Sequence, residues 1–427
     1  MTEASFQRTA VGNVRLHVLP TDRFKTYAVA LYIGSPLRED RVTRNALAPF
    51  VLRRGTKTYP TTQLFREKQA DLYGAGFGFD VYKRGDYQLV QFQLDIVDDK
   101  YVSESDSLLR QGLHFLGEAV TKPALENGHF LDRYVQDEKE TVRKRLEAIV
   151  NDKIRYAAER CMEEMCKHEP YRLHPLGKIA DLASLTSDEL YNNYIEWLKE
   201  SPMDLYIVGN TTLDEVKAYV EEAFAFPERA SSPDYVRAIP TKKEGSVNTV
   251  VEKLDVSQGK LNMGLRCDVT YADDRYPAAL MYNGILGAFP HSKLFLNVRE
   301  KASLAYYAAS RYDGHKGILT IQSGIEVANY EQACAIIQEQ LEEMRAGKIS
   351  ETELTQTRAM ITNQLREGND SAFDRIAFDF NTVLSGKKRT PEEIAEAITR
   401  VTTDEIRQFA ETVQLDTIYF LRDRKED

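Results

Sequence analysis

The pattern of hydrophobic and polar positions places strands before helices in each half of the chain. Apolar and β-branched residues dominate two predicted strands, and apolar residues alternate with polar ones in a third: residues 14–19, 27–34 and 87–97. Long helical patterns follow, and the clearest are residues 330–345, 351–367 and 391–400. Strands and helices in separate blocks are typical of α+β domains. We therefore expect antiparallel or mixed sheets, each covered by helices on one side.

A weak internal repeat indicates two related halves. Thr186 and Glu189 form a Thr-x-x-Glu capping-box pattern, and Thr402 and Glu405 repeat it about half a chain later. In such a box the threonine oxygen accepts a hydrogen bond from a helix amide and the glutamate reaches back. In both places a helix follows, and then an apolar, β-rich run, at residues 204–209 and 416–421. The repeated order predicts a duplication, and hence two homologous domains.

Prolines and glycines near the middle of the chain mark a boundary between these halves. Pro227 and Pro233 flank a polar stretch, and Pro240 and Gly245 flank a second, lysine-containing stretch. Such stretches are typical of linkers between domains. We therefore expect an N-terminal domain at residues 1–228, a linker at 229–245 and a C-terminal domain at 246–427.

Composition narrows the functional classes. The 427 residues are 42% hydrophobic and 29% charged, which is normal for a soluble globular protein, and the net charge of -10 argues against nucleic-acid binding. The chain has no run of 18 apolar residues, so we expect no membrane span. Its first residues have neither the basic nor the apolar region of a secretory signal, and four cysteines do not suggest a disulfide framework. A cytoplasmic protein is the expectation.

Candidate metal ligands are few. No two of the seven histidines lie four residues apart, the spacing that puts both rings on one helix face. The nearest cluster of metal-ligating residue types matches no standard zinc spacing: Cys161, Cys166, His168 and His174. A structural zinc site there is the alternative to two cysteines that pack as small apolar residues, and the helical context favours packing. There is also no Gly-x-Ser-x-Gly nucleophile motif.

A glycine cluster at residues 74–78 invites a phosphate-loop interpretation. It lacks the following Lys-Ser/Thr, and it leads into the β-rich residues 79–82 instead of a helix. A bend followed by an edge strand is the better prediction. The unpaired backbone groups of an edge strand can bind an extended peptide.

The segment 44–56, R-N-A-L-A-P-F-V-L-R-R-G-T, resembles the zinc-site helix of the insulinase and mitochondrial-processing-peptidase family, the pitrilysin superfamily. In that family a His-x-x-Glu-His motif leads into Gly-Thr. When the chain is registered on Gly55-Thr56, the histidine positions fall on Ala46 and Phe50 and the glutamate position on Pro49. These side chains can neither hold a metal nor accept a proton. The resemblance therefore implies a member that has lost its zinc chemistry.

The third zinc ligand of the family is a glutamate on a later helix, with a second glutamate seven residues before it. Glu147 and Glu140 match this pair, and their spacing puts them on one helix face. The alternative is that both take part in ordinary ion pairs four residues apart on a solvated helix, with Lys144 and Arg143. Without histidine partners, Glu147 is not a metal site.

Two further segments extend the resemblance over essentially the whole chain. Residues 171–178 are similar to a Tyr-Gly-x-His-Pro-Leu-Gly-Arg stretch of the family, which implies membership but no catalytic role. Residues 282–307 are similar to the family's Leu-Arg-Glu-Lys-Arg-Gly-Leu-Ala-Tyr region, and Arg299 and Tyr306 fall on its arginine and tyrosine. In the family the arginine binds a substrate carbonyl, and the tyrosine hydroxyl stabilises the tetrahedral intermediate. The alternative is a helix-end arginine and a core tyrosine.

The resemblance implies one half of a clam shell: a non-catalytic subunit that binds no cofactor itself and lends Arg299 and Tyr306 to a zinc-bearing partner with His-x-x-Glu-His. The expected substrate is a peptide. A mitochondrial presequence is disfavoured, because the matching loop at residues 286–291 is short and holds a proline. The rival hypothesis is a structural or peptide-binding scaffold with no proteolytic role. A clam-shell contact is also large enough to allow a homodimer of the isolated chain.

Overall fold

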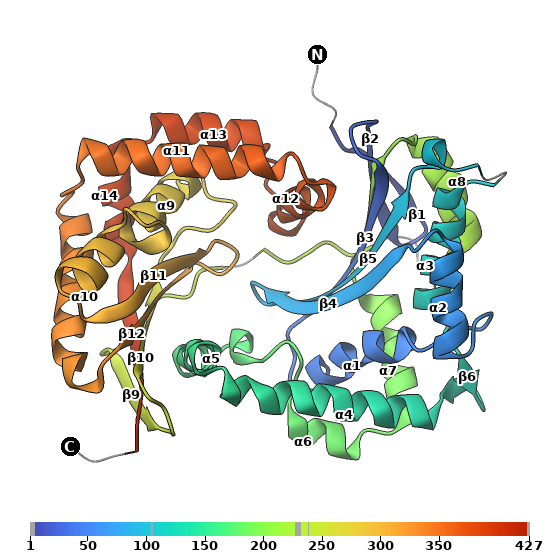
Figure 1. Ribbon diagram of the computed structural model, residues 1–427, viewed down its shortest axis with the longest axis horizontal. Coiled ribbons are helices and arrows are strands. Elements are labelled where there is room, and N and C mark those ends of the chain that lie inside the picture. Colours follow the sequence, from blue (N-terminus) through green and yellow to red (C-terminus); the bar gives the residue numbers. More distant parts are fainter. Residues whose placement is uncertain (1–4, 104–105, 227–231, 238, 425–427) are drawn as a thin grey trace. The chain divides into compact units, whose positions relative to one another are not determined.

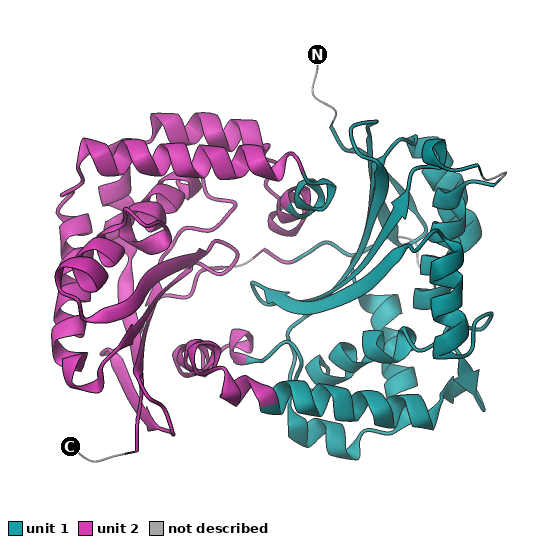
Figure 2. Cartoon of the chain, viewed as in Figure 1, with its two compact units in different colours: residues 1–147, 173–235, 371–377 teal, residues 148–172, 236–370, 378–427 magenta. Residues whose placement is uncertain are grey.

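Two mixed sheets organise the chain. The computed structural model describes residues 5–103, 106–226, 232–237 and 239–424 (Figure 1). The chain divides into two units that are not continuous in sequence (Figure 2). Unit 1 comprises residues 1–147, 173–235 and 371–377, and unit 2 comprises residues 148–172, 236–370 and 378–427.

Unit 1 contains a six-stranded sheet in which the last strand in sequence lies between the first strands. The strands in spatial order are β1 (Gln7–Val11), β2 (Val14–Pro20), β8 (Met203–Gly209), β3 (Thr26–Pro36), β5 (Tyr87–Val97) and β4 (Gly76–Arg84). β2 and β8 are parallel, and the other neighbours are antiparallel. Val90, Phe92 and Leu94 of β5 enter the hydrophobic core, which confirms the core face that their alternation predicts.

Helices cover one face of this sheet. They are α1 (Val42–Leu52), α2 (Thr62–Asp71), α3 (Leu108–Thr121), α4 (Asp132–Ala148), α6 (Ile179–Ser184), α7 (Ser187–Glu200) and α8 (Leu213–Ala223). Gly117 shows how close the packing is: a Cβ atom there would lie 2.7 Å from the backbone oxygen of Ala223, so α3 can approach α8 only with glycine at this point. A short hairpin of β6 (Leu125–Glu126) and β7 (His129–Phe130) precedes α4.

Unit 2 repeats the same sheet topology with five strands. The strands in spatial order are β9 (Asn248–Lys253), β13 (Gln414–Arg422), β10 (Gly259–Arg266), β12 (Ile318–Ile325) and β11 (Ala305–Asp313). The last strand in sequence again lies between the first two, parallel to one and antiparallel to the other. The order β9-β13-β10-β12-β11 thus matches β2-β8-β3-β5-β4 of unit 1. The shared topology confirms the predicted duplication.

Several helices of unit 2 lie where the sequence pattern predicts them. They are α5 (Lys153–Met165), α9 (Tyr276–Asn283), α10 (Tyr330–Arg345), α11 (Glu351–Gly368), α13 (Pro391–Arg400) and α14 (Thr403–Thr412), with α12 (Ala372–Ser385) beginning in unit 1. Two π-helices lie between α9 and β11, at Gly284–Ala288 and Phe295–Lys301. The capping boxes predicted before α7 and α14 are both formed, at Thr186 and Thr402.

The segment 148–172 belongs to unit 2 although it interrupts unit 1 in sequence, between α4 and α6. Its helix α5 packs on β10 and β13, where Ala157 and Cys161 form a buried cluster with Tyr419 and Leu421. Beyond α5, the Glu169 carboxylate accepts a 2.6 Å hydrogen bond from Arg266 of β10. The compact units therefore depart from the continuous domains expected from sequence. Residues 232–235 of the predicted linker also belong to unit 1.

The glycine cluster forms the predicted bend and edge strand. Tyr73 and Gly74 have left-handed φ angles of 57° and 72°, and β4 then forms an edge of the six-stranded sheet. None of the helices in the described part of the chain is both long and apolar enough to cross a bilayer.

Candidate functional site

The degenerate zinc positions lie in the core of unit 1. Ala46 and Phe50 are 0% and 1% exposed and belong to the main hydrophobic cluster, and Pro49 is buried inside α1. A methyl group, a proline ring and a benzyl ring supply no donor atom for a metal. The residues present therefore do not fit zinc.

The surroundings of Phe50 are aromatic and cationic. Its ring packs edge-on against Phe79 of β4, with 4.8 Å between centres. The guanidinium carbon of Arg53 lies 5.6 Å from the Phe50 ring centre and 5.5 Å from that of Phe79, and the guanidinium carbon of Arg145 lies 4.9 Å from the Phe50 ring centre. These distances are within the range of cation–π attraction. Where the family holds a cation with three ligands, this chain places two guanidinium groups of its own.

The two glutamates that match the family pair form ordinary helix ion pairs. Arg143 donates to Glu140 at 2.6 and 2.8 Å and also to Glu147, one turn to either side of it on α4. The hydrogen bond from Arg143 lowers the pKa of Glu140 to about 2. The α4 side chain over Phe50 is that of Arg145. No pattern in the sequence singled out Arg145.

A buried glutamate on α4, also missed in the sequence, ties this helix to the end of α1. Glu138 is 1% exposed and accepts hydrogen bonds from Arg54 at 3.2 Å and from Arg53 at 3.5 Å. Arg54 also covers the ring of Tyr134, at 4.9 Å. The sequence position of Glu138 could have revealed it. Glu138 lies four residues before Val142 on an apolar helix face, where a carboxylate needs a partner.

The Gly-Thr motif serves the turn after α1. The Thr56 hydroxyl donates to Glu118 at 3.1 Å and accepts the Tyr59 amide hydrogen at 3.0 Å. A Cβ atom on Gly55 would lie 2.8 Å from the backbone of Pro60. Only glycine fits this close approach, so the Gly-Thr motif has a structural role in this turn.

The His-Pro-Leu-Gly stretch anchors the start of α1. Gly177 has a φ of 78°, and a Cβ atom there would overlap Thr43. The Thr43 hydroxyl accepts the Lys178 amide hydrogen at 3.1 Å and donates to Asp181 at 2.8 Å. Gln88 of β5 adds a 2.6 Å hydrogen bond to the carbonyl of Pro175. The contacts account for this motif without a catalytic role.

The cysteines near His168 pack as apolar residues. Cys161 and Cys166 are 1% and 0% exposed, and burial raises the pKa of Cys161 well above its usual range. Cys166 clusters with Met165 and Ile318. Across the described ranges, no three His, Cys, Asp or Glu side chains are grouped as metal ligands.

Arg299 and Tyr306 both reach solvent in unit 2. Arg299 lies on the π-helix Phe295–Lys301, with its guanidinium 4.6 Å from the Phe295 ring centre, and no carboxylate pairs with it in the described part of the chain. Tyr306 is the second residue of the edge strand β11 and is 55% exposed. Its hydroxyl donates to Glu326 at 2.7 Å, and this hydrogen bond raises the pKa of Tyr306. The alternative of a core tyrosine is therefore wrong.

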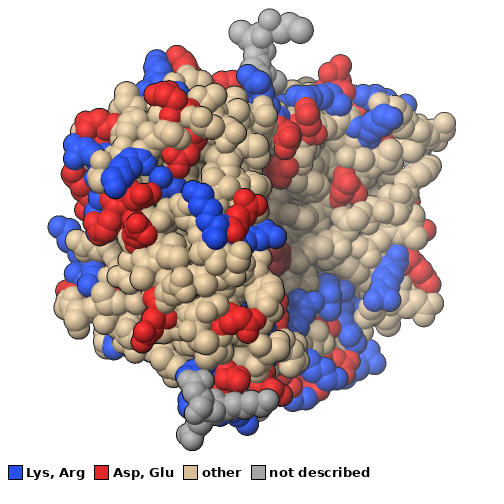
Figure 3. All heavy atoms as spheres, turned by 60° about the vertical axis from the view of Figure 1, so that its left-hand side comes forward, with Lys and Arg blue, Asp and Glu red and all other residues tan. Residues whose placement is uncertain are grey.

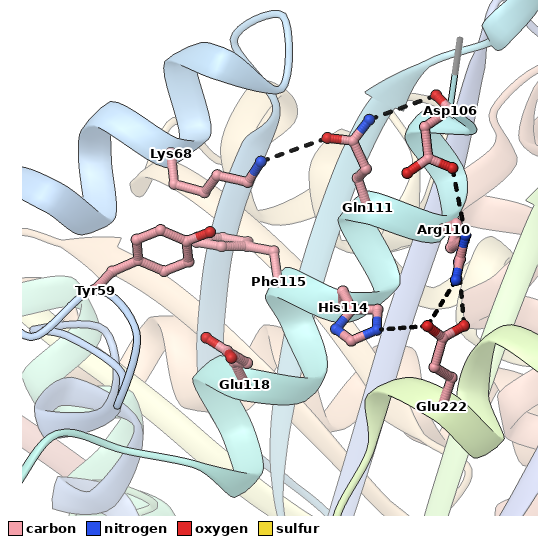
Figure 4. A pocket seen from close by; sticks show the side chains of 9 residues that line it. All are labelled: Tyr59, Lys68, Asp106, Arg110, Gln111, His114, Phe115, Glu118 and Glu222. Carbon is pink, nitrogen blue, oxygen red and sulfur yellow. Dashed lines mark hydrogen bonds and ion pairs between the residues drawn. The ribbon is translucent and has the colours of Figure 1, made fainter. Parts of the chain in front are cut away.

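A separate polar pocket of about 300 Å³ lies between α2, α3 and α8 (Figure 4). Arg110 donates to Glu222 at 2.7 and 3.1 Å, and His114 lies 3.4 Å from the same carboxylate. Lys68 is 3.4 Å from Gln111. Most charged side chains of the pocket pair with one another, which leaves little net charge to bind an ionic ligand. Over the molecular face in Figure 3, acidic and basic side chains are interspersed in the same way.

Comparisons with known proteins agree with the absence of zinc ligands in α1. A family described as the Peptidase M16 inactive domain matches residues 184–361. A Bacillus subtilis (strain 168) protein named probable inactive metalloprotease YmfF is 40% identical over 411 residues, which are 96% of each chain.

Solved structures share the whole fold. A conserved protein from Enterococcus faecalis V583 has a TM-score of 0.93 and 31% identity, with 99% of this chain and 100% of that chain covered. The peptidase M16 inactive domain from Pseudomonas fluorescens has a TM-score of 0.79 at 15% identity, with 99% and 100% covered, and shows the fold alone. The chain belongs to the M16, or pitrilysin-type, metallopeptidase family, as a metalloprotease-like member without the family's zinc ligands.

Proposed function

We propose that this chain is the catalytically silent subunit of a heterodimeric zinc-dependent peptidase. The observation that carries the proposal is the contrast between the two units. The positions for zinc ligands in unit 1 are packed with apolar side chains, whereas Arg299 and Tyr306 of unit 2 are exposed and ready to donate hydrogen bonds. A homologous partner with His-x-x-Glu-His would hold the zinc, which activates the attacking water.

Arg299 and Tyr306 suit complementary tasks. An arginine without a carboxylate partner can donate to a peptide carbonyl through its planar fork. The Tyr306 hydroxyl can donate to a developing oxyanion once it turns away from Glu326, and its raised pKa keeps it protonated at neutral pH. The chain thus supplies hydrogen-bond donors and no nucleophile.

The edge strand β4 offers a place for the peptide backbone. Gly76 and Gly78 are exposed, and a Cβ atom on Gly78 would meet no atom within 4 Å. An extended peptide can therefore approach the strand closely and add to the sheet through main-chain hydrogen bonds. This mode of binding favours short or unfolded peptides over folded proteins.

The test is reconstitution with a partner that carries His-x-x-Glu-His. Arg299→Ala should lower the turnover of the heterodimer by about 10²-fold or more, the scale of losing one oxyanion-hole donor. Arg311→Ala is the matched control, since Arg311 is also exposed, lies on β11 and forms no ion pair within the described residues. We expect the control to keep its turnover.

Two results would overturn the proposal. Full activity of the Arg299→Ala heterodimer would remove the assigned role of this side chain. Affinity capture from the native cell that returns no zinc-bearing homologue would favour the scaffold hypothesis, in which the two side chains serve no reaction.

A further inference from the structure

The degenerate zinc position of unit 1 has exchanged a metal cation for guanidinium groups, and this changes the ligand that the position suits. We infer that Arg145 and Arg53, here called the arginine pair, bind a carboxylate group of an extended peptide. The inference concerns the isolated chain and requires neither a partner subunit nor peptide cleavage.

The arginine pair is gathered at one aromatic ring. Arg145 lies 4.9 Å and Arg53 lies 5.6 Å from the centre of Phe50. The two guanidinium carbons therefore cannot lie farther apart than the sum of these distances. Two like charges at such a separation repel each other, and the faces of Phe50 and Phe79 offset only part of this cost. An anion between or beside them would relieve it.

The protein supplies little counter-charge to the arginine pair. Arg145 is exposed and has no carboxylate partner in the ranges that the structure covers. The Arg53 side chain is 39% exposed, and its contact with Glu138 is long, at 3.5 Å, while Glu138 also pairs with Arg54 at 3.2 Å. Arg143, two residues before Arg145, is by contrast neutralised by two glutamates. The positive charge at the arginine pair is therefore available to a ligand.

The neighbouring strand indicates that the carboxylate belongs to a peptide. Phe79, which contacts both Phe50 and Arg53, is a residue of the edge strand β4. A peptide that adds to β4 through its backbone would pass beside the arginine pair. Guanidinium groups bind carboxylates through two parallel hydrogen bonds, which gives both affinity and orientation. The carboxylate could be an acidic side chain or the C-terminus of the peptide.

Three fluorescently labelled peptides with the same Val/Thr-rich sequence would test this inference on the isolated chain. One carries a central glutamate and an amidated C-terminus, the second has a central glutamine and a free C-terminus, and the third has neither carboxylate. Fluorescence anisotropy should show at least one of the first two binding about tenfold more tightly than the third, an advantage that decreases in about 0.5 M salt. The peptide with the advantage identifies the source of the carboxylate.

Substitutions locate the effect. Arg145→Gln should remove the advantage, about tenfold in affinity, with little change in melting temperature, because Arg145 is exposed, forms no ion pair among the described residues, and loses only one weak cation–π contact. Lys144→Gln removes the same charge from the next position of α4, where Lys144 pairs with Glu140, and should change affinity less than twofold.

Three outcomes would each overturn the inference: equal binding of all three peptides, no detectable binding of any, or equal losses in the two variants. Failure here would leave the proposed roles of Arg299 and Tyr306 intact, since those residues lie in unit 2. Failure of the heterodimer proposal would likewise leave peptide binding by the isolated chain to be measured.

Discussion

Asp204 of β8 is fully buried and is held by three side chains. Arg15 donates to its two oxygens at 2.8 and 2.7 Å, His17 lies at 2.8 Å, and the Tyr235 hydroxyl donates at 3.1 Å. Burial alone would raise the pKa of Asp204, but the hydrogen bonds from Arg15 and His17 outweigh it and lower the pKa. Tyr235, a residue of the predicted linker, is thereby held against the sheet of unit 1.

Replacing this carboxylate should cost stability in a pH-dependent way. Asp204→Asn leaves Arg15 without its buried counter-charge and should lower the free energy of unfolding by about 3–5 kcal/mol at neutral pH. Because the folded-state pKa is depressed, the carboxylate contributes stability above its unfolded pKa of about 4, and loses it as the pH falls through the folded value. The difference between variant and wild type should therefore shrink below about pH 4.

Urea unfolding at neutral and acidic pH measures both effects. Asp234→Asn is the control, since Asp234 is exposed and its contact with Arg15 is 3.5 Å, and it should change stability by less than about 0.5 kcal/mol. A pH-independent loss in Asp204→Asn would contradict the assigned charge interaction.

At the scale of elements, local signals predicted the helices and strands with the clearest patterns. α10 and α13 begin and end at the predicted residues, and α13 begins with Pro391 behind a capping box at Thr390. The π-helices Gly284–Ala288 and Phe295–Lys301 were not predicted, because their apolar spacing over one or two turns does not differ clearly from that of an α-helix. Arg299 lies on one of them. It could be predicted as a candidate site residue, but the π-helical conformation of its backbone could not.

Pro49 lies inside α1, where proline destabilises the helix. Proline has no amide hydrogen, so the helix loses the bond from position 49 to the carbonyl of Asn45. Pro49→Ala should raise the free energy of unfolding by about 1–2 kcal/mol, since an interior proline costs about 3 kcal/mol and the smaller side chain loses some packing. Thermal unfolding would measure the gain.

The matched substitution is Pro391→Ala. Pro391 stands in the first turn of α13, where the backbone amide has no hydrogen-bond partner within the helix. Alanine at this position should therefore not raise the free energy of unfolding. Equal stabilisation by both substitutions would show that the α1 position carries no special cost.

At the scale of the whole molecule, the duplication was visible in the sequence but the exchange of segments between halves was not. Matching capping boxes and strands are local patterns, and they predicted the repeated topology. The absence of zinc ligands at Ala46, Pro49 and Phe50 could likewise be read from one short segment of the sequence. The approach of Arg145 to Phe50 depends on how two distant helices pack, and no spacing along the chain reports it.

Segment 148–172 is the clearest case of such long-range packing. It precedes the linker in sequence, yet α5 covers β10 and β13 of unit 2. Its end joins a nearly buried network, in which Glu169 accepts hydrogen bonds from Arg266 at 2.6 Å and forms an ion pair with Lys316 at 2.9 Å. Separating α5 from that sheet would expose apolar surface and leave these charges unpaired, which is costly.

Cutting the chain between Glu244 and Gly245 should therefore not separate the two pieces. A protease site inserted there lies in an exposed stretch, and Gly245 already has a left-handed φ of 71°. After cleavage, residues 1–244 carry α5 and residues 245–427 carry the sheet that α5 covers, so the pieces should elute together in gel filtration. Pieces that elute separately would contradict the packing of α5. Arg266→Ala in the cleaved protein should weaken the association, because it leaves Glu169 with one cationic partner fewer.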